Sequence, residues 1–303
     1  MNNDIKITIV TPTYNRAHTL PRVFNSLKKQ SFLGFKWLIM DDGSTDNTKE
    51  VVEGFKEESP FEIEYYYLEN SKKFYTSFLG IEKVESPFFT ILDSDDAYIP
   101  DALETMYQSI KSLDSKIFIS ATFNSITPEG KLVGTPFPEG LEGSILEMRY
   151  KHKVRGDKHT IFNTSKYHRY LKKFDYSKFK GKYAPQKIFF HMYDAAGERS
   201  KFINKYTRIY YQDNDDANSM SKDRVKPTSY EGLLCGHLSF INNYKSLLFV
   251  YPVALIRNIV GYQYYSFKNG SSFRNILMDI QPSLIKVLSW GLLPFSFLYH
   301  KVR

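Results

Sequence analysis

The stretch IKITIVTPTYNR, residues 5–16, contains the pattern on which the fold assignment rests. Its first half, IKITIV, is strand-like and apolar, and it predicts a buried first strand. TPTYNR then predicts a loop, because Pro12 has no N–H to donate to a neighbouring strand. From Thr19 to Gln30, apolar residues recur at helical spacing, with Thr19 as the expected N-cap. The stretch therefore predicts a strand followed by a helix that packs on a sheet.

The same order of strand and helix continues along the next hundred residues. Further strands are expected at 36–40, 61–68, 88–92 and 116–123, and further helices at 48–56, 76–84 and 100–113. Strands that alternate with helices imply right-handed crossovers and a doubly wound, mostly parallel sheet. The predicted fold class is therefore α/β, of Rossmann-like type, with a C-terminal helical extension.

A chain of 303 residues is long enough for one large α/β domain and an appendage. We expect residues 1–124 to form a nucleotide-binding half and residues 125–225 to form the acceptor-binding half of the same domain. Residues 226–303 would form the helical extension, which could associate with a membrane.

Composition narrows the class of partner. The net charge is +8, but Lys and Arg are scattered among Tyr and Phe, which fits anionic headgroups or a phosphorylated substrate as well as a polynucleotide. No zinc-ligand spacing, aromatic RNA signature or recognition-helix pattern is visible, so nucleic acid is not an expected partner. Cys235 is the single cysteine, so no internal disulfide can form. The N-terminus lacks the pattern of a signal peptide, and a cytoplasmic location is expected.

Two apolar stretches near the C-terminus, 247–265 and 285–300, fall short of a membrane span. Arg257 interrupts the first, and Pro294 with flanking charge limits the second. The second stretch and the residues after it have the aromatic and basic composition of a segment that lies on an anionic membrane surface. Such a segment would place the chain peripherally at the inner face of the cell membrane. The aromatic residues of the second stretch are Trp290, Phe295, Phe297 and Tyr299, and the basic residues Lys301 and Arg303 follow it. The alternative is a C-terminal helix that closes the core.

The sharpest chemical feature is an acidic cluster directly after a predicted buried strand. Asp93, Asp95 and Asp96 place three carboxylates within four residues, where mutual repulsion would be destabilising without a neutralising cation. Oxygen ligands of this kind suit Mg²⁺ or Mn²⁺, which would also bind the phosphates of a substrate. The alternative is a solvated turn in which Asp96 or Asp101 caps the next helix.

A second acidic pair also follows a predicted strand. Asp41 or Asp42 could accept a hydrogen bond from a base N–H or a ribose hydroxyl, whereas Asp46 is expected to stabilise the start of the next helix. The Tyr14 ring in the preceding loop could stack on a base. Ligands of such sheets bind at the carboxyl ends of the strands, so the three clusters together predict a nucleotide-diphosphate site.

The motifs TPTYNRAHTL, DDGSTDNT and DSDDAYIPDAL, in this order, resemble the family 2 glycosyltransferases with the glycosyltransferase A fold, over about residues 5–110. The resemblance implies roles for several residues. The base would contact Pro12, Tyr14 and Asp42, the ribose or metal would contact Asp93, the metal would bind Asp95, and Arg16 would lie nearby. Lys73, or its neighbour Lys72, falls where the family carries a loop near the diphosphate, although the glycines of that loop are missing here.

The resemblance also raises a question about the general base. The family's acidic residue before an aromatic helix is replaced here by Gln186, and an amide cannot take a proton from an acceptor hydroxyl. The substitutes, in order, are Asp157, Asp194 and His191. Each also has a purely structural alternative: Asp157 as a turn residue, Asp194 as a polar group at a helix end, and His191 as a half-buried ring. The run DNDDAN at 213–218 is a further candidate metal or acceptor site, or a solvated loop.

The expected function is metal-assisted transfer of a sugar from a nucleotide-diphosphate sugar to a hydroxyl of a glycan or lipid-linked acceptor, with inversion. Polysaccharide or glycoconjugate assembly is the process that the resemblance implies. The alternative is a catalytically impaired relative that binds nucleotide sugar or glycan without turnover. A nucleotidyltransferase is not supported, because no glycine-rich phosphate loop follows the first strand.

Overall fold

The structure is a computed structural model that describes residues 4–212, 226–244, 247–281 and 283–302. The chain divides into two compact units. The first comprises Met1–Lys178 with Glu198–Asn218, and the second comprises Phe179–Gly197 with Ser219–Arg303. Residues 179–197, which the sequence assigned to the acceptor half, therefore group with the C-terminal helices.

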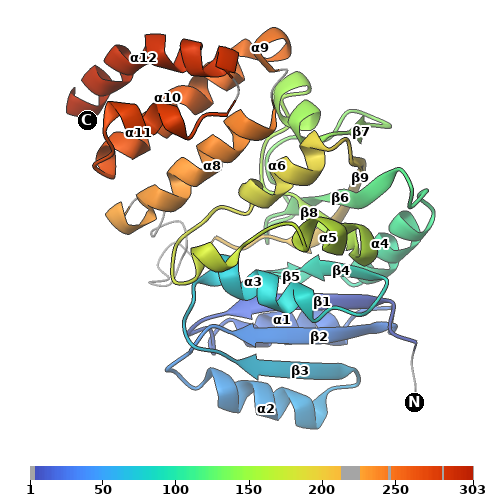
Figure 1. Ribbon diagram of the computed structural model, residues 1–303. Helices are drawn as coiled ribbons and strands as arrows, with labels where there is room; N and C mark the ends of the chain where they lie inside the picture. The colour runs from blue at the N-terminus through green and yellow to red at the C-terminus, as the bar shows by residue number, and fades with distance from the viewer. Residues whose placement is uncertain (1–3, 213–225, 245–246, 282, 303) are drawn as a thin grey trace. The chain divides into compact units, whose positions relative to one another are not determined.

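The first unit is built on one nine-stranded sheet, whose strands are labelled in Figure 1. Its order is β3-β2-β1-β4-β8-β6-β9-β5, and β7 pairs with β9. Six of these described strands run in the same direction, whereas β8, β5 and β7 run against them. The strands are β1 (Ile7–Thr13), β2 (Phe35–Asp41), β3 (Glu62–Tyr67), β4 (Phe88–Ile91), β5 (Ala97–Tyr98), β6 (Phe118–Ile126), β7 (Glu142–Gly143), β8 (His159–Asn163) and β9 (Arg199–Ile209). The mostly parallel α/β sheet expected from the sequence is thus confirmed.

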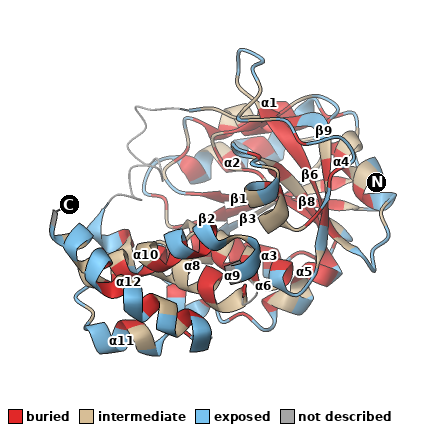
Figure 2. Ribbon diagram, turned by 90° about the horizontal axis from the view of Figure 1, so that it is seen from above, coloured by how far each residue is buried: buried red, intermediate tan, exposed pale blue. Residues whose placement is uncertain are grey.

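Helices cover both faces of this sheet. One face packs against α1 (Leu20–Lys28), α2 (Thr48–Glu58) and α4 (Ala102–Lys111), whose apolar residues share one core with β1, β2 and β6. Phe24 of α1 stacks on Phe55 of α2 with ring centroids 4.2 Å apart. The other face carries α3 (Lys73–Glu82) and α5 (Thr164–Leu171). The central strands are accordingly almost entirely buried (Figure 2).

Strand β1 is longer than expected and includes Pro12. Its pairing with β2 runs from Ile7 to Thr13, whereas its pairing with β4 ends at Val10. Alternate residues of a parallel strand bond to opposite neighbours, and Thr13 O accepts from Asp42 N on the β2 side. Pro12 thus faces the β4 side, beyond the last residue of β4, where no donor is needed. The prediction that Pro12 ends the strand was wrong for this reason.

Helices α1, α2 and α4 begin close to where the sequence predicted, but not every expected capping hydrogen bond forms. Thr19 and Asp101 occupy the N-cap positions of α1 and α4, yet neither side chain makes a capping hydrogen bond. Asp46 does stabilise the start of α2, because its Oδ1 accepts from the backbone N of Thr48 at 3.1 Å. Asp96 makes no cap and bonds elsewhere, as described below.

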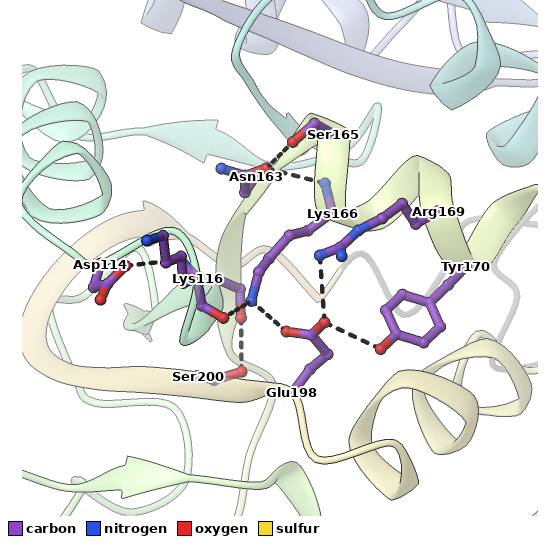
Figure 3. A network of polar contacts seen from close by, with 10 residues as sticks. Asp114, Lys116, Asn163, Ser165, Lys166, Arg169, Tyr170, Glu198 and Ser200 are labelled. Carbon is purple, nitrogen blue, oxygen red and sulfur yellow. Dashed lines mark hydrogen bonds and ion pairs between the residues drawn. The ribbon is translucent and has the colours of Figure 1, made fainter.

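A buried ion pair fixes the start of β9 (Figure 3). Lys166 of α5 is 4% exposed, and its Nζ lies 2.5 Å from Glu198 Oε2 and donates to Lys116 O at 2.9 Å. Tyr170 and Arg169 contact the other oxygen of Glu198 at 3.0 and 3.6 Å. Removing one partner of a buried pair costs about 3–5 kcal/mol, because a charge is left uncompensated. This network therefore positions the strand that carries Arg208 at its far end.

The second unit is helical. Its helices are α6 (Lys187–Ala195), the 3₁₀ turn Pro227–Ser229, α8 (Tyr230–Asn243), α9 (Leu247–Val250), α10 (Pro252–Lys268), α11 (Phe273–Met278) and α12 (Ser283–Val302). Helix α10 packs against both α8 and α12, and α12 buries Ile285 and Leu293. Phe297 packs against Phe267 and Phe273 with centroids 5.5 and 5.3 Å apart, so it is not part of an exposed aromatic face as expected. Within the described residues, none of the helices has the length and apolarity required to cross a membrane.

A small second core in the first unit supports the loop before β8. It consists of Phe137, Leu141, Met148, Val154 and Phe202. Beside it, two backbone segments approach closely at Gly134 and Gly156, which have φ values of +81° and +87°. A Cβ on Gly156 would lie 2.4 Å from Val133 O, which no side chain can tolerate.

We expect Gly156→Ala to lower the free energy of unfolding by about 2–5 kcal/mol, because a left-handed backbone and a steric clash add together. Gly130→Ala is the matched control, since Gly130 has φ +78° and open space around its Cα. It should cost only about 1–2 kcal/mol. Chemical denaturation measures both, and equal losses would contradict the close approach at Gly156.

Candidate active site

The acidic cluster lies at the carboxyl end of β4. Carboxylate oxygens of Asp93, Asp95 and Asp96 all lie within 4.8 Å of one another. Asp93 and Asp95 keep about a third of their side chains exposed, at 31% and 32%, whereas the side chain of Asp96 is 1% exposed. The cluster thus has two accessible carboxylates and one buried carboxylate.

Each of these carboxylates has a basic side chain of the protein beside it. Lys73 Nζ, at the start of α3, lies 2.8 Å from Asp93 Oδ1. Arg16 Nη2 lies 3.8 Å from Asp95 Oδ2, and Arg208 Nη1 lies 3.1 Å from Asp96 Oδ2. The sequence predicted that the cluster needs a bound cation for neutralisation. The chain itself supplies much of the compensating charge, and the bound cation stays a prediction.

The protonation tendencies of the three carboxyl groups differ. Burial alone would raise the pKa of Asp93, but the Lys73 ammonium and, after it, the charge of Arg208 together lower it. Burial and the charge of Asp93 raise the pKa of Asp95. Burial raises the pKa of Asp96 to about 7, despite the opposing charge of Arg208. Asp93 is therefore the carboxylate most firmly held in its ionised form.

Arg208 is the site residue that the sequence did not reveal. Its side chain is 5% exposed and bridges two carboxylates, with Nη1 at Asp96 and Nη2 3.3 Å from Asp157 Oδ1. Its Nε also donates to Ser125 Oγ at 3.1 Å. The only available signal was a basic residue between Thr207 and Ile209, at the end of a strand that the sequence did not predict. This guanidinium connects the acidic cluster to the expected general base.

The backbone of the acidic loop is fixed by α1. Arg22 Nη1 donates to Asp95 O at 2.6 Å, and its guanidinium lies 3.7 Å above the ring of Tyr211. Tyr211 N in turn donates to Asp96 Oδ1 at 3.1 Å. The bonds of Asp96 therefore go to the segment after β9 rather than to a helix cap.

The second acidic pair lies at the carboxyl end of β2 and is buried. Asp41 accepts from Ser44 N at 2.8 Å and from Tyr65 OH at 2.6 Å. Asp42 Oδ1 accepts from Ser71 N at 2.7 Å and Thr76 Oγ1 at 2.5 Å. Burial raises the pKa of Asp42. The hydrogen bonds of Asp41 thus stabilise the turn after β2, whereas those of Asp42 connect this turn to the start of α3.

The loop after β1 packs on this turn. Asn15 has φ +51°, its N donates to Ser44 Oγ at 2.8 Å, and its Oδ1 accepts from Thr45 N at 2.7 Å. Tyr14 beside it is 37% exposed, whereas Pro12 is buried within β1. The three motifs therefore converge at one edge of the sheet, and Tyr14 presents the accessible ring there.

The three candidate bases lie in different environments. Asp157 is in the first unit and its side chain is 52% exposed. Its partner is Arg208 rather than the adjacent Lys158, whose Nζ donates to Asn124 Oδ1 at 2.7 Å and Thr135 O at 2.6 Å. Burial lowers the pKa of Lys158 to about 8. Asp157 is accordingly the accessible candidate beside the acidic cluster.

His191 and Asp194 lie on α6, inside the second unit. His191 is 9% exposed, its Nδ1 is 3.3 Å from Ser239 Oγ, and burial lowers its pKa to about 3. Asp194 is 5% exposed and its Oδ2 accepts from Tyr244 OH at 2.6 Å. Gln186 occupies the N-cap position of the same helix. The candidate run at 213–218 lies outside the described residues.

Known proteins provide an independent comparison. The first relatives are glycosyltransferases of Rickettsia, such as an uncharacterized one of Rickettsia conorii that is 30% identical over 155 residues, 48% of this chain and 25% of the relative. The chain spans a quarter or less of the length of these relatives. A Campylobacter jejuni GalNAc(5)-diNAcBac-PP-undecaprenol beta-1,3-glucosyltransferase is 27% identical over 235 residues, 76% of this chain and 72% of the relative.

Solved structures confirm the fold. Staphylococcus aureus TarS, residues 1–349, in complex with UDP-GlcNAc has a TM-score of 0.59 at 18% identity, covering 97% of this chain and 92% of that chain. The family model described as Glycosyl transferase family 2 matches residues 8–205, well over half of the chain. This range contains every element of the acidic cluster's surroundings except Arg208 and Tyr211, which follow directly after it. The chain belongs to glycosyl transferase family 2.

Proposed function

We propose that the chain is an active glycosyltransferase that moves a sugar from a nucleotide-diphosphate sugar to an acceptor hydroxyl with inversion. The observation that carries this proposal is the convergence of the acidic cluster with the Tyr14 loop and the Asp41–Asp42 turn at one sheet edge. Such an edge is where α/β sheets bind nucleotides. Polysaccharide or glycoconjugate assembly is the process that fits, because the C. jejuni relative is named for a lipid-linked glycan acceptor.

The donor set fits Mg²⁺ or Mn²⁺. Asp93 and Asp95 offer accessible carboxylate oxygens within 4.8 Å of each other, and hard divalent cations prefer one or two carboxylates together with phosphate oxygens. Asp96 is committed to Arg208 and Tyr211 and would support the site without ligating. A bound cation would stabilise the negative charge of a leaving diphosphate. Lys73, at the N-terminus of α3, would bind the same diphosphate.

Asp157 fits the role of general base. It is the accessible carboxylate beside the acidic cluster, and Arg208 holds it in place through the 3.3 Å contact. His191 and Asp194 are buried in the second unit and bonded there. Proton removal from an acceptor hydroxyl requires an accessible acceptor group within hydrogen-bond reach, which Asp157 alone of the three provides.

Removal of the metal should abolish nucleotide binding. Asp95→Ala should weaken binding of nucleoside diphosphates in the presence of Mn²⁺ and eliminate sugar transfer, because one of two accessible ligands is lost. Asp101→Ala is the matched control, since Asp101 is exposed and makes no capping bond; it should leave both unchanged. Calorimetric titration with a panel of nucleoside diphosphates, with and without Mn²⁺, measures this. Equal affinity in both conditions would contradict the metal proposal.

Replacement of the base should affect chemistry rather than donor binding. Asp157→Asn should lower the transfer rate by about 10²–10⁴-fold and leave nucleotide affinity nearly unchanged. His191→Gln and Asp194→Asn serve as comparisons. If either abolishes transfer in a folded protein while Asp157→Asn retains it, the base belongs to α6 and our assignment is wrong. Full activity in all three variants would exclude a side-chain base among them.

We also propose that the second unit lies on an anionic membrane surface. Helix α12 buries one side against α10, whereas its opposite side exposes large apolar residues at 57–67%. These are Leu284, Val287, Trp290, Phe295 and Leu298. Basic residues between 252 and 301 outnumber the single acidic residue, Asp279; they are Arg257, Lys268, Arg274, Lys286 and Lys301. An apolar face with surrounding positive charge suits a surface of anionic lipid.

Substitution of the exposed side of α12 tests this better than truncation, because truncation would also uncover α10. Trp290→Ala with Phe295→Ala should reduce co-sedimentation with phosphatidylglycerol vesicles by about ten-fold or more. Leu33→Ala with Ile117→Ala, at exposed apolar positions of the first unit, should not. Added salt should weaken binding of the unsubstituted chain. Equal sedimentation of both double variants would contradict membrane binding through α12.

A further inference from the structure

The loop between β7 and β8, together with the π-helical turn Glu147–Lys151 at its start, contains a dense group of basic side chains. Residues 149–155 read RYKHKVR, and four of these seven residues are exposed Lys or Arg. We call these four the basic loop residues: Arg149, Lys151, Lys153 and Arg155.

The backbone of this loop is held by the small second core and by hydrogen bonds to Thr135. Met148 and Val154 are buried in the small second core, and Val154 N donates to Met148 O at 3.1 Å. Arg155 N donates to Thr135 Oγ1 at 2.9 Å, and Arg155 O accepts from Thr135 N at 3.2 Å. Lys153 is held at φ +55°, a left-handed conformation that only a constrained loop maintains in a lysine. The loop therefore presents its cations from a rigid base.

The basic loop residues differ from neighbouring cations in their lack of acidic partners among the described residues. Within the described part of the chain, none of the four forms an ion pair. Other cations in the same region are paired, since Arg199 and Lys201 of β9 both contact Glu142 at 3.0 and 3.1 Å. Among the described residues, no carboxylate thus neutralises the positive charge of the basic loop residues.

The loop leads directly to the expected base. Asp157 follows Arg155 by two residues, across the close approach of Gly156 to Gly134. Arg155 itself is joined to Thr135 on both sides of its peptide, directly beside this close approach. Asp157 itself is paired with Arg208 and does not neutralise the loop. The basic loop residues therefore belong to the same short, anchored segment of chain that carries Asp157.

We infer that the acceptor carries phosphate esters, which the basic loop residues bind while its hydroxyl reaches Asp157. This inference rests on the proposed function and names the class of acceptor. Phosphate is the anion that best matches the basic loop residues, because guanidinium and ammonium groups spaced along a loop bind successive or doubly charged phosphate groups. The phosphate could belong to a soluble polyol-phosphate chain or to a lipid-linked acceptor.

Two probes separate these sources. The first is soluble poly(glycerol phosphate), and the second is polyprenyl phosphate in neutral phosphatidylcholine vesicles, which lack the anionic lipid proposed for α12. Dextran serves as an uncharged comparison. The test variant replaces the four basic loop residues with Gln. The control variant makes the same change of charge at four exposed positions of the first unit, in or directly after helices, that form no ion pair with the described residues: Lys29, Lys49, Lys172 and Lys173.

The test variant should bind at least one phosphate probe about ten-fold or more weakly than the unsubstituted chain, and with a smaller salt dependence. The control variant should bind it nearly as well as the unsubstituted chain. Loss with poly(glycerol phosphate) alone indicates a soluble polymer, and loss with the vesicles alone indicates a lipid-linked acceptor. Equal losses in both variants, or no binding of either phosphate probe, would overturn the inference.

Donor binding distinguishes this inference from the proposed function. Nucleoside diphosphate affinity with Mn²⁺ should be the same in the test variant and the unsubstituted chain, which also shows that the variant is folded. Phosphate binding without any nucleotide binding would contradict the proposed function and leave the anion site standing. Nucleotide binding without a difference between the two variants toward phosphate would refute the anion site alone. The double variant Arg149→Gln with Arg155→Gln repeats the comparison with a smaller change.

Discussion

The charge balance at the end of β4 is the constraint on which the rest of the first unit depends. Three carboxylates lie within 4.8 Å of one another, and one of them is almost fully buried. Such a cluster is destabilising unless cations lie beside it. The cations come from three separate segments: the loop after β1, the start of α3 and the end of β9. The cluster can therefore exist only when these segments are folded around it.

The buried network around Glu198 belongs to the same constraint. Arg208 must reach Asp96 from the far end of β9, and the Lys166–Glu198 pair fixes where that strand begins. Between them, β9 pairs with β6 despite irregularities in register near Phe123 and Asn124. A strand with bulges needs fixed ends to deliver a side chain at a defined place. The two buried ion pairs supply these ends.

Local patterns predicted the first 124 residues well. Strand and helix periods in that half are clean, and each acidic motif follows its strand directly, so sequence order alone indicated their convergence. Arg208 could not be found in this way, because its partners Asp96 and Asp157 are distant in sequence and its strand pairs with neighbours from elsewhere in the chain. The extent of β1 was missed because whether Pro12 ends a strand depends on where the neighbouring β4 stops. The burial of His191 and Asp194 depends on contacts with α8, which the α6 sequence does not reveal.

The close approach of Gly134 and Gly156 fixes the backbone of the loop before β8 independently of the exposed side chains that the loop carries. Because backbone contacts at these glycines and the buried Val154 hold the loop, its exposed positions bear little of the cost of folding. Substitution at an exposed position away from such contacts usually changes stability by less than about 0.5 kcal/mol. Related proteins could therefore carry different side chains at the exposed positions of this loop while the position of Asp157 is unchanged. If this loop binds the acceptor as we infer, a new acceptor preference can arise by surface substitution alone, without a compensating change in the core.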